Sequence, residues 1–238
     1  MPRSWLALPL LSILATAALA QEVPGGPGGP LGQAGVRASE RLPAQGLVVV
    51  QRDTGELVAM SNNGRYVIRG EIWDAWGKKK LASMDEVHAS AASMPIEQLM
   101  AGRWGDLAPV TYGTGPRTVT LFVDPLCPYC HKLLQQLPAL AADFTFRVLV
   151  VPVLGEDSGK ATRKVGCAID TAAAERMVLS ADYSADLAQK PDCNLTPLQQ
   201  RLVLASMIGL NGVPYLVLPS GKVQQGLPAD LAALLAQG

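Results

Sequence analysis

Two cysteines separated by two residues are the strongest chemical signal in the sequence. Cys127 and Cys130 flank a Pro-Tyr pair, between an apolar run that ends at residue 123 and a helical pattern that begins at residue 128. Cys127 would cap that helix, so that free backbone N–H groups and the positive end of the helix dipole favour its thiolate form. Cys130, one turn further on, would attack a mixed disulfide on Cys127. The motif predicts thiol-disulfide exchange.

Three other interpretations of this motif are open from the residues alone. With His131 included, the segment has the Cys-x-x-Cys-His spacing of c-type haem attachment. A zinc site would need a second ligand pair, and the sequence offers only two histidines and the widely spaced Cys167 and Cys193. The third is a purely structural disulfide, although a bridge that closes so few residues constrains the unfolded chain little. We favour exchange chemistry and expect neither a metal nor another cofactor.

The N-terminal segment indicates the compartment in which these cysteines work. Arg3 precedes an apolar run of about 15 residues, shorter than the roughly 20 that a membrane span needs, and small residues follow up to Ala20. This pattern is typical of a secretory signal peptide that is cleaved near Ala20. Disulfides persist in oxidising compartments. We therefore expect a periplasmic protein.

The composition indicates a folded protein without a charged partner. Of the 238 residues, 49% are hydrophobic and 17% are charged, and 20 Lys and Arg balance 20 Asp and Glu. This apolar content supports a buried core. The zero net charge offers no electrostatic attraction to nucleic acid or to an anionic membrane, so we expect no nucleic-acid partner.

The pattern along the chain divides it into five segments. Short β-like runs separated by turns indicate a meander of hairpins, and a capping box at Ser83 and Glu86 opens a helix that would join two domains. The expected boundaries are a signal peptide at 1–20, a Gly/Pro-rich tether at 21–45, a small β-rich domain at 46–80, a linker helix region at 81–116 and a catalytic domain at 117–238.

The last of these segments alternates strand and helix. We expect a strand at 118–123, helical residues at 128–142, a strand at 144–151, mostly helical residues at 159–190, a helix from Thr196 to near Gly209, a strand at 215–218 and a last helix from Pro228. This order is βαβ, a helical insert and then ββα. The predicted fold class is α+β.

At residues 123–133 the sequence Val-Asp-Pro-Leu-Cys-Pro-Tyr-Cys-His-Lys-Leu resembles the active-site segment of the bacterial periplasmic disulfide isomerases DsbC and DsbG. Residues 64–70 resemble part of that family's N-terminal dimerisation domain. The resemblance implies a thioredoxin-like catalytic domain with a helical insert, preceded by a small β-rich dimerisation domain and a linker helix. It also implies that Cys127 is the nucleophile and Cys130 the resolving cysteine.

The same resemblance implies further site residues. Cys167 and Cys193 fall where DsbC carries a second, structural disulfide. The Val213-Pro214 pair matches the loop that carries a cis-proline beside the active site, where backbone groups of Val213 would pair with an extended substrate as an added strand. We place Tyr129 of the motif in the same substrate-binding group.

Two side chains beside the motif are candidates for tuning the thiols. Asp124 ends the strand before the motif, although an acidic residue there is more often a solvated turn residue. His131 lies in the first helical turn, where it would either tune Cys127 or simply be exposed.

Together these features predict a periplasmic thiol-disulfide oxidoreductase, foremost a disulfide isomerase or reductase that acts on misbridged secreted proteins. The resemblance implies misfolded secreted proteins as substrates, a membrane reductant resembling DsbD and a homodimer. Val213 leaves a DsbA-like dithiol oxidase open, because DsbC and DsbG usually have Thr before this proline whereas Val is familiar from DsbA oxidases. A third hypothesis is a non-redox chaperone or binding module of a secretion or conjugation apparatus.

Overall fold

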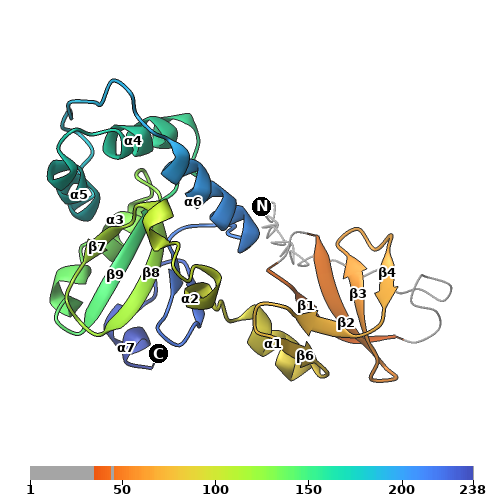
Figure 1. The fold of residues 1–238 in the computed structure, drawn as a ribbon. Helices are drawn as coiled ribbons and strands as arrows, with labels where there is room; N and C mark the ends of the chain where they lie inside the picture. The colour runs from red at the N-terminus through yellow and green to blue at the C-terminus, as the bar shows by residue number, and fades with distance from the viewer. Residues whose placement is uncertain (1–34, 44–45, 238) are drawn as a thin grey trace, which may run out of the picture.

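The computed structural model describes residues 35–43 and 46–237. An N-terminal β-rich region and a larger C-terminal domain are joined by helix α1 (Met84–Ala91) and the stretch that follows it (Figure 1). The predicted signal peptide at 1–20 and most of the predicted tether at 21–45 lie outside the described residues.

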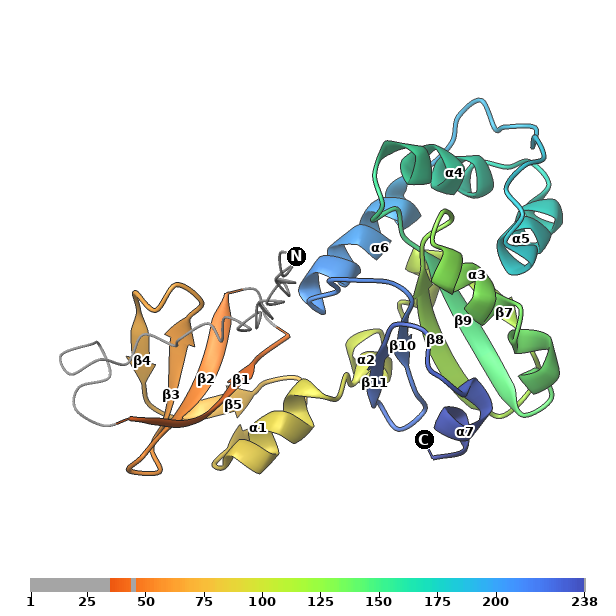
Figure 2. The ribbon, with the colours of Figure 1, turned by 180° about the vertical axis from the view of Figure 1, so that it is seen from behind.

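The N-terminal region is built on a four-stranded antiparallel sheet in the order β1-β2-β3-β4 (Figure 2). Its strands are β1 (Val36–Arg41), β2 (Leu47–Arg52), β3 (Leu57–Ser61) and β4 (Val67–Arg69). Strand β2 buries alternate side chains on the two faces: Val50 packs with Val58 and Met60, whereas Val49 packs with Val87 of α1. The sheet therefore has a small core on each side.

Strand β1 corrects the expected start of this domain. It pairs with β2 from residue 36 onward, so the sheet begins within the stretch expected to be a tether and not at residue 46. Three of the six β1 residues are charged, Arg37, Glu40 and Arg41, and none is fully buried. An edge strand of this composition lacks the apolar alternation by which a strand is recognised in a sequence.

The linker region follows a second, small hairpin of β5 (Ile72–Asp74) and β6 (Lys79–Leu81). Helix α1 begins with the predicted capping box, in which Glu86 N donates to Ser83 Oγ at 3.3 Å and Ser83 N donates to the Glu86 carboxylate at 3.2 Å. Pro95 separates α1 from α2 (Ile96–Leu99), and a 3-10 turn at Trp104–Leu107 leads into β7 (Val110–Tyr112). The predicted linker helix is confirmed.

The C-terminal domain contains a five-stranded sheet in the order β11-β10-β8-β9-β7. The remaining strands are β8 (Arg117–Val123), β9 (Phe144–Val150), β10 (Tyr215–Val217) and β11 (Val223–Gln225). The central strands β8 and β9 run parallel, and the other pairs are antiparallel. This is the expected βαβ and ββα order around two buried strands.

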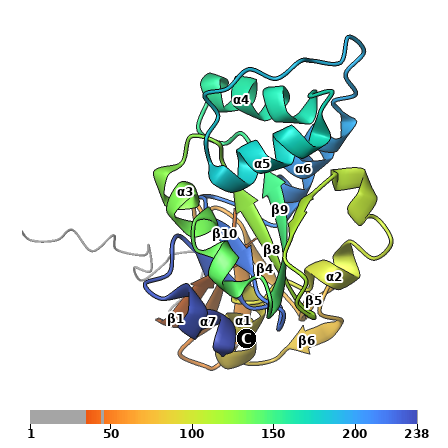
Figure 3. The same cartoon turned by 90° about the vertical axis from the view of Figure 1, so that its left-hand side faces the viewer.

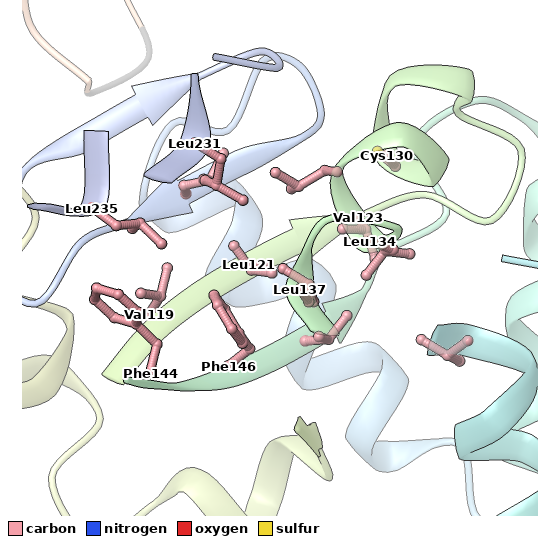
Figure 4. Packing of buried hydrophobic residues seen from close by; sticks show 14 of the residues in the cluster. Val119, Leu121, Val123, Cys130, Leu134, Leu137, Phe144, Phe146, Leu231 and Leu235 are labelled. Atoms are coloured by element: carbon pink, nitrogen blue, oxygen red, sulfur yellow. The ribbon is translucent and has the colours of Figure 1, made fainter. Parts of the chain in front are cut away.

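Helices cover both faces of this sheet. On one face, side chains of β8 and β9 pack against α3 (Pro128–Leu134) and α7 (Leu231–Ala236), with Leu134, Leu231 and Leu235 over Val119 and Leu121 (Figure 4). On the other face, Phe122 and Leu149 pack against α2 and α6 (Thr196–Met207). The alternation of side chains along β8 therefore supplies two cores, and the α+β, thioredoxin-like fold class is confirmed.

The helical insert consists of α4 (Glu156–Gly166) and α5 (Thr171–Ser180). Together with α6 it gathers at the end of the sheet opposite α7 and the C-terminus (Figure 3). Residues 181–195 contain no helix, which corrects the expectation of helical structure to residue 190. Ala181 ends α5 in the left-handed conformation, with φ of 56°.

Two further helix boundaries differ from the prediction. Helix α3 ends at Leu134, and a separate 3-10 turn covers Leu137–Leu140, because Pro138 has no N–H with which to bond the carbonyl of Leu134. The last helix begins at residue 231 and not at 228, where Asp230 caps it by accepting from Ala233 N at 2.9 Å.

Candidate active site

Cys127 occupies the N-cap of α3, directly after the turn that ends β8. Its Sγ accepts a hydrogen bond from Cys130 N at 3.4 Å, and Pro128 fills the first helical position. The same sulfur lies 3.6 Å from the carbonyl oxygen of Val213. The local sequence explains this arrangement, since proline suits the first helical turn and leaves the next backbone N–H groups free to face the sulfur.

Cys130 lies behind Cys127, on the inner side of α3. It has no exposed surface and belongs to the same apolar cluster as Leu133 and Leu134 (Figure 4). Both cysteines of the motif are free thiols in the structure. Burial, followed by the hydrogen bond with Cys127, raises the pKa of the Cys130 thiol far above its ordinary value. Cys130 is therefore a neutral thiol at neutral pH.

The loop before β10 faces Cys127. The Val213-Pro214 peptide bond is cis, and the Val213 carbonyl is the group that approaches the sulfur. The structure thus brings together four residues that the sequence selected from two distant segments: Cys127, Cys130, Val213 and Pro214.

A groove of about 510 Å³ runs beside the Cys127 sulfur. Its described lining contains no charged side chain and comprises Cys127, Pro128, Tyr129, Val153, Leu154, Leu210, Asn211, Gly212 and Val213. Apolar side chains are unusually exposed here, with Tyr129 at 59% and Leu154 at 55% exposure. Exposed apolar surface around a reactive sulfur is suited to binding unfolded polypeptide.

Asp124 is buried, so the alternative of a solvated turn residue is wrong. Its Oδ1 accepts from Leu126 N at 2.8 Å and from Ser158 Oγ at 2.7 Å. Its Oδ2 accepts from Val153 N at 2.8 Å and from Leu154 N at 3.0 Å. These four bonds tie the motif to the β9-α4 loop. The carboxylate therefore holds two of the residues that line the groove.

His131 points away from the groove. Its Nε2 lies 2.6 Å from the carbonyl oxygen of Pro125, and its ring stacks on that of Tyr183 with a centroid distance of 6.4 Å. Neither contact involves Cys127. A direct tuning of Cys127 by His131 therefore finds no support in the geometry.

Tyr183 is a residue near the motif that sequence reasoning missed. Its ring packs on the cluster that contains both cysteines, and its hydroxyl is buried without a hydrogen-bond partner among the described residues. It lies in the insert, far from the motif along the chain and in a stretch expected to be helical. Its position inside the Cys167 to Cys193 loop was the only available signal.

Cys167 and Cys193 are joined by a disulfide with a Cα to Cα distance of 5.3 Å and a sequence separation of 26. Cys167 follows the last turn of α4, where the helix dipole disfavours a thiolate. Lys164 in that turn donates to the carbonyl oxygens of Tyr183 and Ala185 at 3.0 and 3.1 Å. The bridge and this lysine together hold the irregular part of the insert.

The haem interpretation of the motif is not supported by the side chains as they are folded. Cys130 has no exposed surface for a thioether bond, and the His131 ring is engaged by Pro125 and Tyr183. Among residues 35–43 and 46–237, no group of three or more His, Cys, Asp and Glu side chains is placed to hold a metal ion. Within the same ranges, no helix is long and apolar enough to cross a membrane.

Solved structures with a similar fold include two from thiol-disulfide proteins. A disulfide interchange protein from Neisseria gonorrhoeae is 24% identical, covers 54% of this chain and 94% of that chain, and gives a TM-score of 0.46. The compact conformation of Proteus mirabilis ScsC is 20% identical, covers 61% of this chain and 80% of that chain, and gives a TM-score of 0.46.

Similarity extends to curated relatives and to a family model. A probable thiol:disulfide interchange protein DsbC from Bordetella pertussis is 29% identical over 199 residues, which cover 82% of this chain and 66% of that protein. The chain thus spans just under two thirds of that relative. DsbC of Escherichia coli is 24% identical over 219 residues, covering 90% of this chain and 87% of that protein. A thioredoxin-like domain model matches residues 110–237, from β7 to the end of α7.

Proposed function

The chain belongs to the thioredoxin-like domain family, and we propose that it is a DsbC-type thiol-disulfide oxidoreductase that works through Cys127 and Cys130. The observation that carries this proposal is the arrangement of the two thiols. Cys127 lies at the start of α3 beside an apolar groove, and Cys130 is a buried thiol directly behind it. A nucleophilic thiol in front and a protected thiol behind are what two-step exchange requires.

The first step is attack by Cys127 on a substrate disulfide. The Cys127 thiolate forms a bond to one substrate sulfur, the substrate S–S bond breaks, and the other sulfur leaves as a thiolate. The Cys130 N–H, which already donates to the Cys127 sulfur, stabilises the attacking thiolate. The product is a mixed disulfide between Cys127 and the substrate.

Two routes lead on from this intermediate. In isomerisation, another substrate thiolate attacks the substrate sulfur, and Cys127 is released as a thiolate with no net oxidation. In reduction, Cys130 attacks Cys127, the two cysteines become a disulfide, and the substrate leaves with two thiols. The second route consumes the reduced protein, so it requires an external dithiol, for which we propose a membrane reductant resembling DsbD.

Misfolded secreted proteins are the proposed substrates. The groove offers exposed Tyr129 and Leu154 as apolar contacts, and backbone groups at Val213 for pairing with an extended chain. Backbone pairing and apolar contact are largely independent of sequence. Such a surface favours chains that expose apolar segments, as misbridged proteins do.

A homodimer through the N-terminal region is part of the proposal. Strand β4 lies at the edge of its sheet and pairs on one side only with β3. Tyr66 and Ile68 at this edge are 58% and 59% exposed, and Trp73 of the neighbouring hairpin is 60% exposed. Exposed apolar side chains beside an open sheet edge support pairing with a second copy.

Periplasmic location is proposed from two features. Residues 1–20 have the pattern of a secretory signal peptide, and the disulfide between Cys167 and Cys193 is of the kind that persists in an oxidising compartment.

A dithiol oxidase is the second candidate, and Val213 is the observation that favours it. This residue presents its carbonyl to the Cys127 sulfur, so its identity bears on the environment of the reactive thiol. The two candidates differ in the direction in which they transfer electrons and share all the site residues.

Recovery of activity from a scrambled-disulfide substrate tests the proposal. The pre-reduced protein is compared with Cys127→Ser and with a Cys167→Ser/Cys193→Ser double variant as the matched control. We expect recovery with the wild type and the double variant, assayed where both are folded, and none with Cys127→Ser. Oxidation of a reduced substrate without unscrambling would establish the oxidase instead. Recovery that survives Cys127→Ser would contradict both and leave a binding module.

A further inference from the structure

The buried hydroxyl of Tyr183 is a polar group near the motif to which the exchange scheme assigns no role. Among the described residues it has no hydrogen-bond partner, although its oxygen is shielded from solvent. Leaving a buried hydroxyl unpaired is costly, and such groups in a native protein often have a functional reason.

Three contacts hold the Tyr183 side chain against the motif. Its ring packs on the cluster that contains Cys127 and Cys130, and it stacks on His131, the residue after Cys130. Its carbonyl accepts from Lys164 at 3.0 Å, within the loop that the Cys167 to Cys193 disulfide closes. The ring is therefore fixed from the insert side, while the hydroxyl is committed to no other described group.

The hydroxyl stays protonated under all conditions in which exchange occurs. Burial raises the pKa of Tyr183 above its ordinary value, and the negative charges of Cys130 and Asp124 raise it further. These charges act on the hydroxyl because they lie near it. Tyr183 is thus a permanent hydrogen-bond donor beside Cys130 and cannot serve as a base.

We propose that Tyr183 acts in the resolving step, where its hydroxyl donates a hydrogen bond to the sulfur of Cys130 as that sulfur becomes a thiolate. A neutral thiol is a weak acceptor, whereas a buried thiolate needs a donor. An uncommitted hydroxyl can turn toward the developing charge without breaking another bond. The inference rests on the proposed roles of Cys127 and Cys130.

The step is balanced without any further reactant. Cys130 loses its proton, its sulfur bonds to the Cys127 sulfur, and the bond between Cys127 and the substrate sulfur breaks. The departing substrate thiolate takes up the proton. Tyr183 keeps its own proton throughout, and the two electrons pass from the Cys127 and Cys130 thiols to the substrate disulfide.

The titratable groups that face Cys130 and Tyr183 are limited in kind. Cys127 lies on the same turn of α3, Asp124 comes from the end of β8, and His131 stacks on the tyrosine ring. The Asp124 carboxylate already accepts four hydrogen bonds. A change in the pH dependence of the resolving step on removal of the Tyr183 hydroxyl alone is therefore a specific readout.

The test measures the two steps separately with oxidised glutathione as the substrate disulfide. Rapid mixing with reduced protein, acid quenching and mass spectrometry give the rate of mixed-disulfide formation at Cys127 and the rate of its resolution. Tyr183→Phe keeps the ring and removes the hydroxyl. Tyr112→Phe is the matched control, because Tyr112 packs on the same cluster from β7.

We expect Tyr183→Phe to slow resolution about tenfold at neutral pH and to move its pH profile upward, since one hydrogen bond to a charged group is lost. The rate of mixed-disulfide formation stays unchanged, as do both rates in Tyr112→Phe. Equal resolution rates in Tyr183→Phe and wild type would overturn the inference, as would an equal slowing of both steps. Failure of Cys127 to form the mixed disulfide would instead overturn the proposed function.

A second variant covers the case in which Tyr183→Phe folds poorly. Incorporation of 3-fluorotyrosine at position 183 preserves the packing and gives a more acidic phenol, which is a stronger donor. We expect resolution to become faster in this variant. A purely structural role for Tyr183 predicts no change, and that result would overturn the inference.

Discussion

The two cysteine pairs of the C-terminal domain differ in their place relative to a helix. Cys127 precedes the first turn of α3, whereas Cys167 follows the last turn of α4. The first position surrounds a sulfur with N–H donors, and the second places it near the negative end of the helix dipole. The first pair consists of free thiols beside a groove, and the second is a disulfide that closes a long loop. Position on a helix therefore separates the candidate reactive pair from the bridging pair.

Each pair also depends on a different part of the chain. The reactive pair is positioned by the Asp124 carboxylate, which fixes the loop on the far side of the groove. The Cys167 to Cys193 bridge holds the insert, and with it the ring of Tyr183. The second pair thus serves the first by holding a residue behind it.

Removal of the Cys167 to Cys193 bridge is the change with the largest expected effect on stability. The chain-entropy estimate for a loop of this length gives a loss of about 3.5 kcal/mol. We expect Cys167→Ser/Cys193→Ser to lower the free energy of unfolding by this amount in urea denaturation while exchange at Cys127 persists. Loss of all exchange in the folded double variant would break the separation between the two pairs.

Asp124→Ala is expected to be almost as destabilising, at about 3 kcal/mol, because it leaves four donors unpaired in a buried place. The exchange rate should fall too, since Val153 and Leu154 lose their anchor. Asp124→Asn is the matched control: it retains one acceptor oxygen and should cost less in the same denaturation experiment. A variant as stable as the wild type would show that the carboxylate is not needed to hold the loop.

Alkaline pH distinguishes the pairs by a smaller effect. The folded-state pKa of Cys130 is raised above the unfolded value of about 8.5, so its contribution to stability is complete below that pH and is lost as pH rises. We expect the reduced protein to lose up to about 1.4 kcal/mol per pH unit above pH 9. The oxidised protein has no Cys130 thiol and should show a weaker dependence there in the same denaturation series. Equal slopes for both forms would contradict this.

The smallest expected effect concerns the apolar groove. Leu154→Ser removes an exposed apolar contact worth about 1 kcal/mol, which corresponds to about a fivefold increase in KM for an unfolded protein substrate. The rate with oxidised glutathione should not change, because that substrate does not need the groove. Leu202→Ser on α6 is the matched control, since Leu202 is exposed and lies outside the lining of the groove. An unchanged KM in Leu154→Ser would remove the groove from substrate binding.

Local sequence patterns predicted much of this comparison. The Cys-Pro-Tyr-Cys segment between a strand and a helix and the capping box at Ser83 are local signals, and the structure bears both elements out. The near-continuous apolar run of β9 indicated a buried central strand, which pairs in parallel with β8. These features depend on residues that are neighbours in the chain, so a sequence is sufficient to find them.

Features that depend on distant residues could not be predicted in this way. The partners of Asp124 include Val153, Leu154 and Ser158 from a separate loop, and nothing in the local pattern shows that the carboxylate is enclosed by them. Tyr183 lies in an irregular segment whose composition resembles a helix. Strand β1 owes its structure to pairing with β2 and not to an apolar pattern of its own.

The most direct test of the account is the location of a trapped mixed disulfide. Reduced Cys130→Ser protein is mixed with a disulfide-bonded peptide, quenched with acid and mapped by mass spectrometry after proteolysis. The account predicts one peptide adduct, on Cys127, with Cys167 and Cys193 still joined to each other. An adduct on Cys167 or Cys193, or no adduct in a folded protein that binds the peptide, would contradict the claim that Cys127 is the reactive thiol.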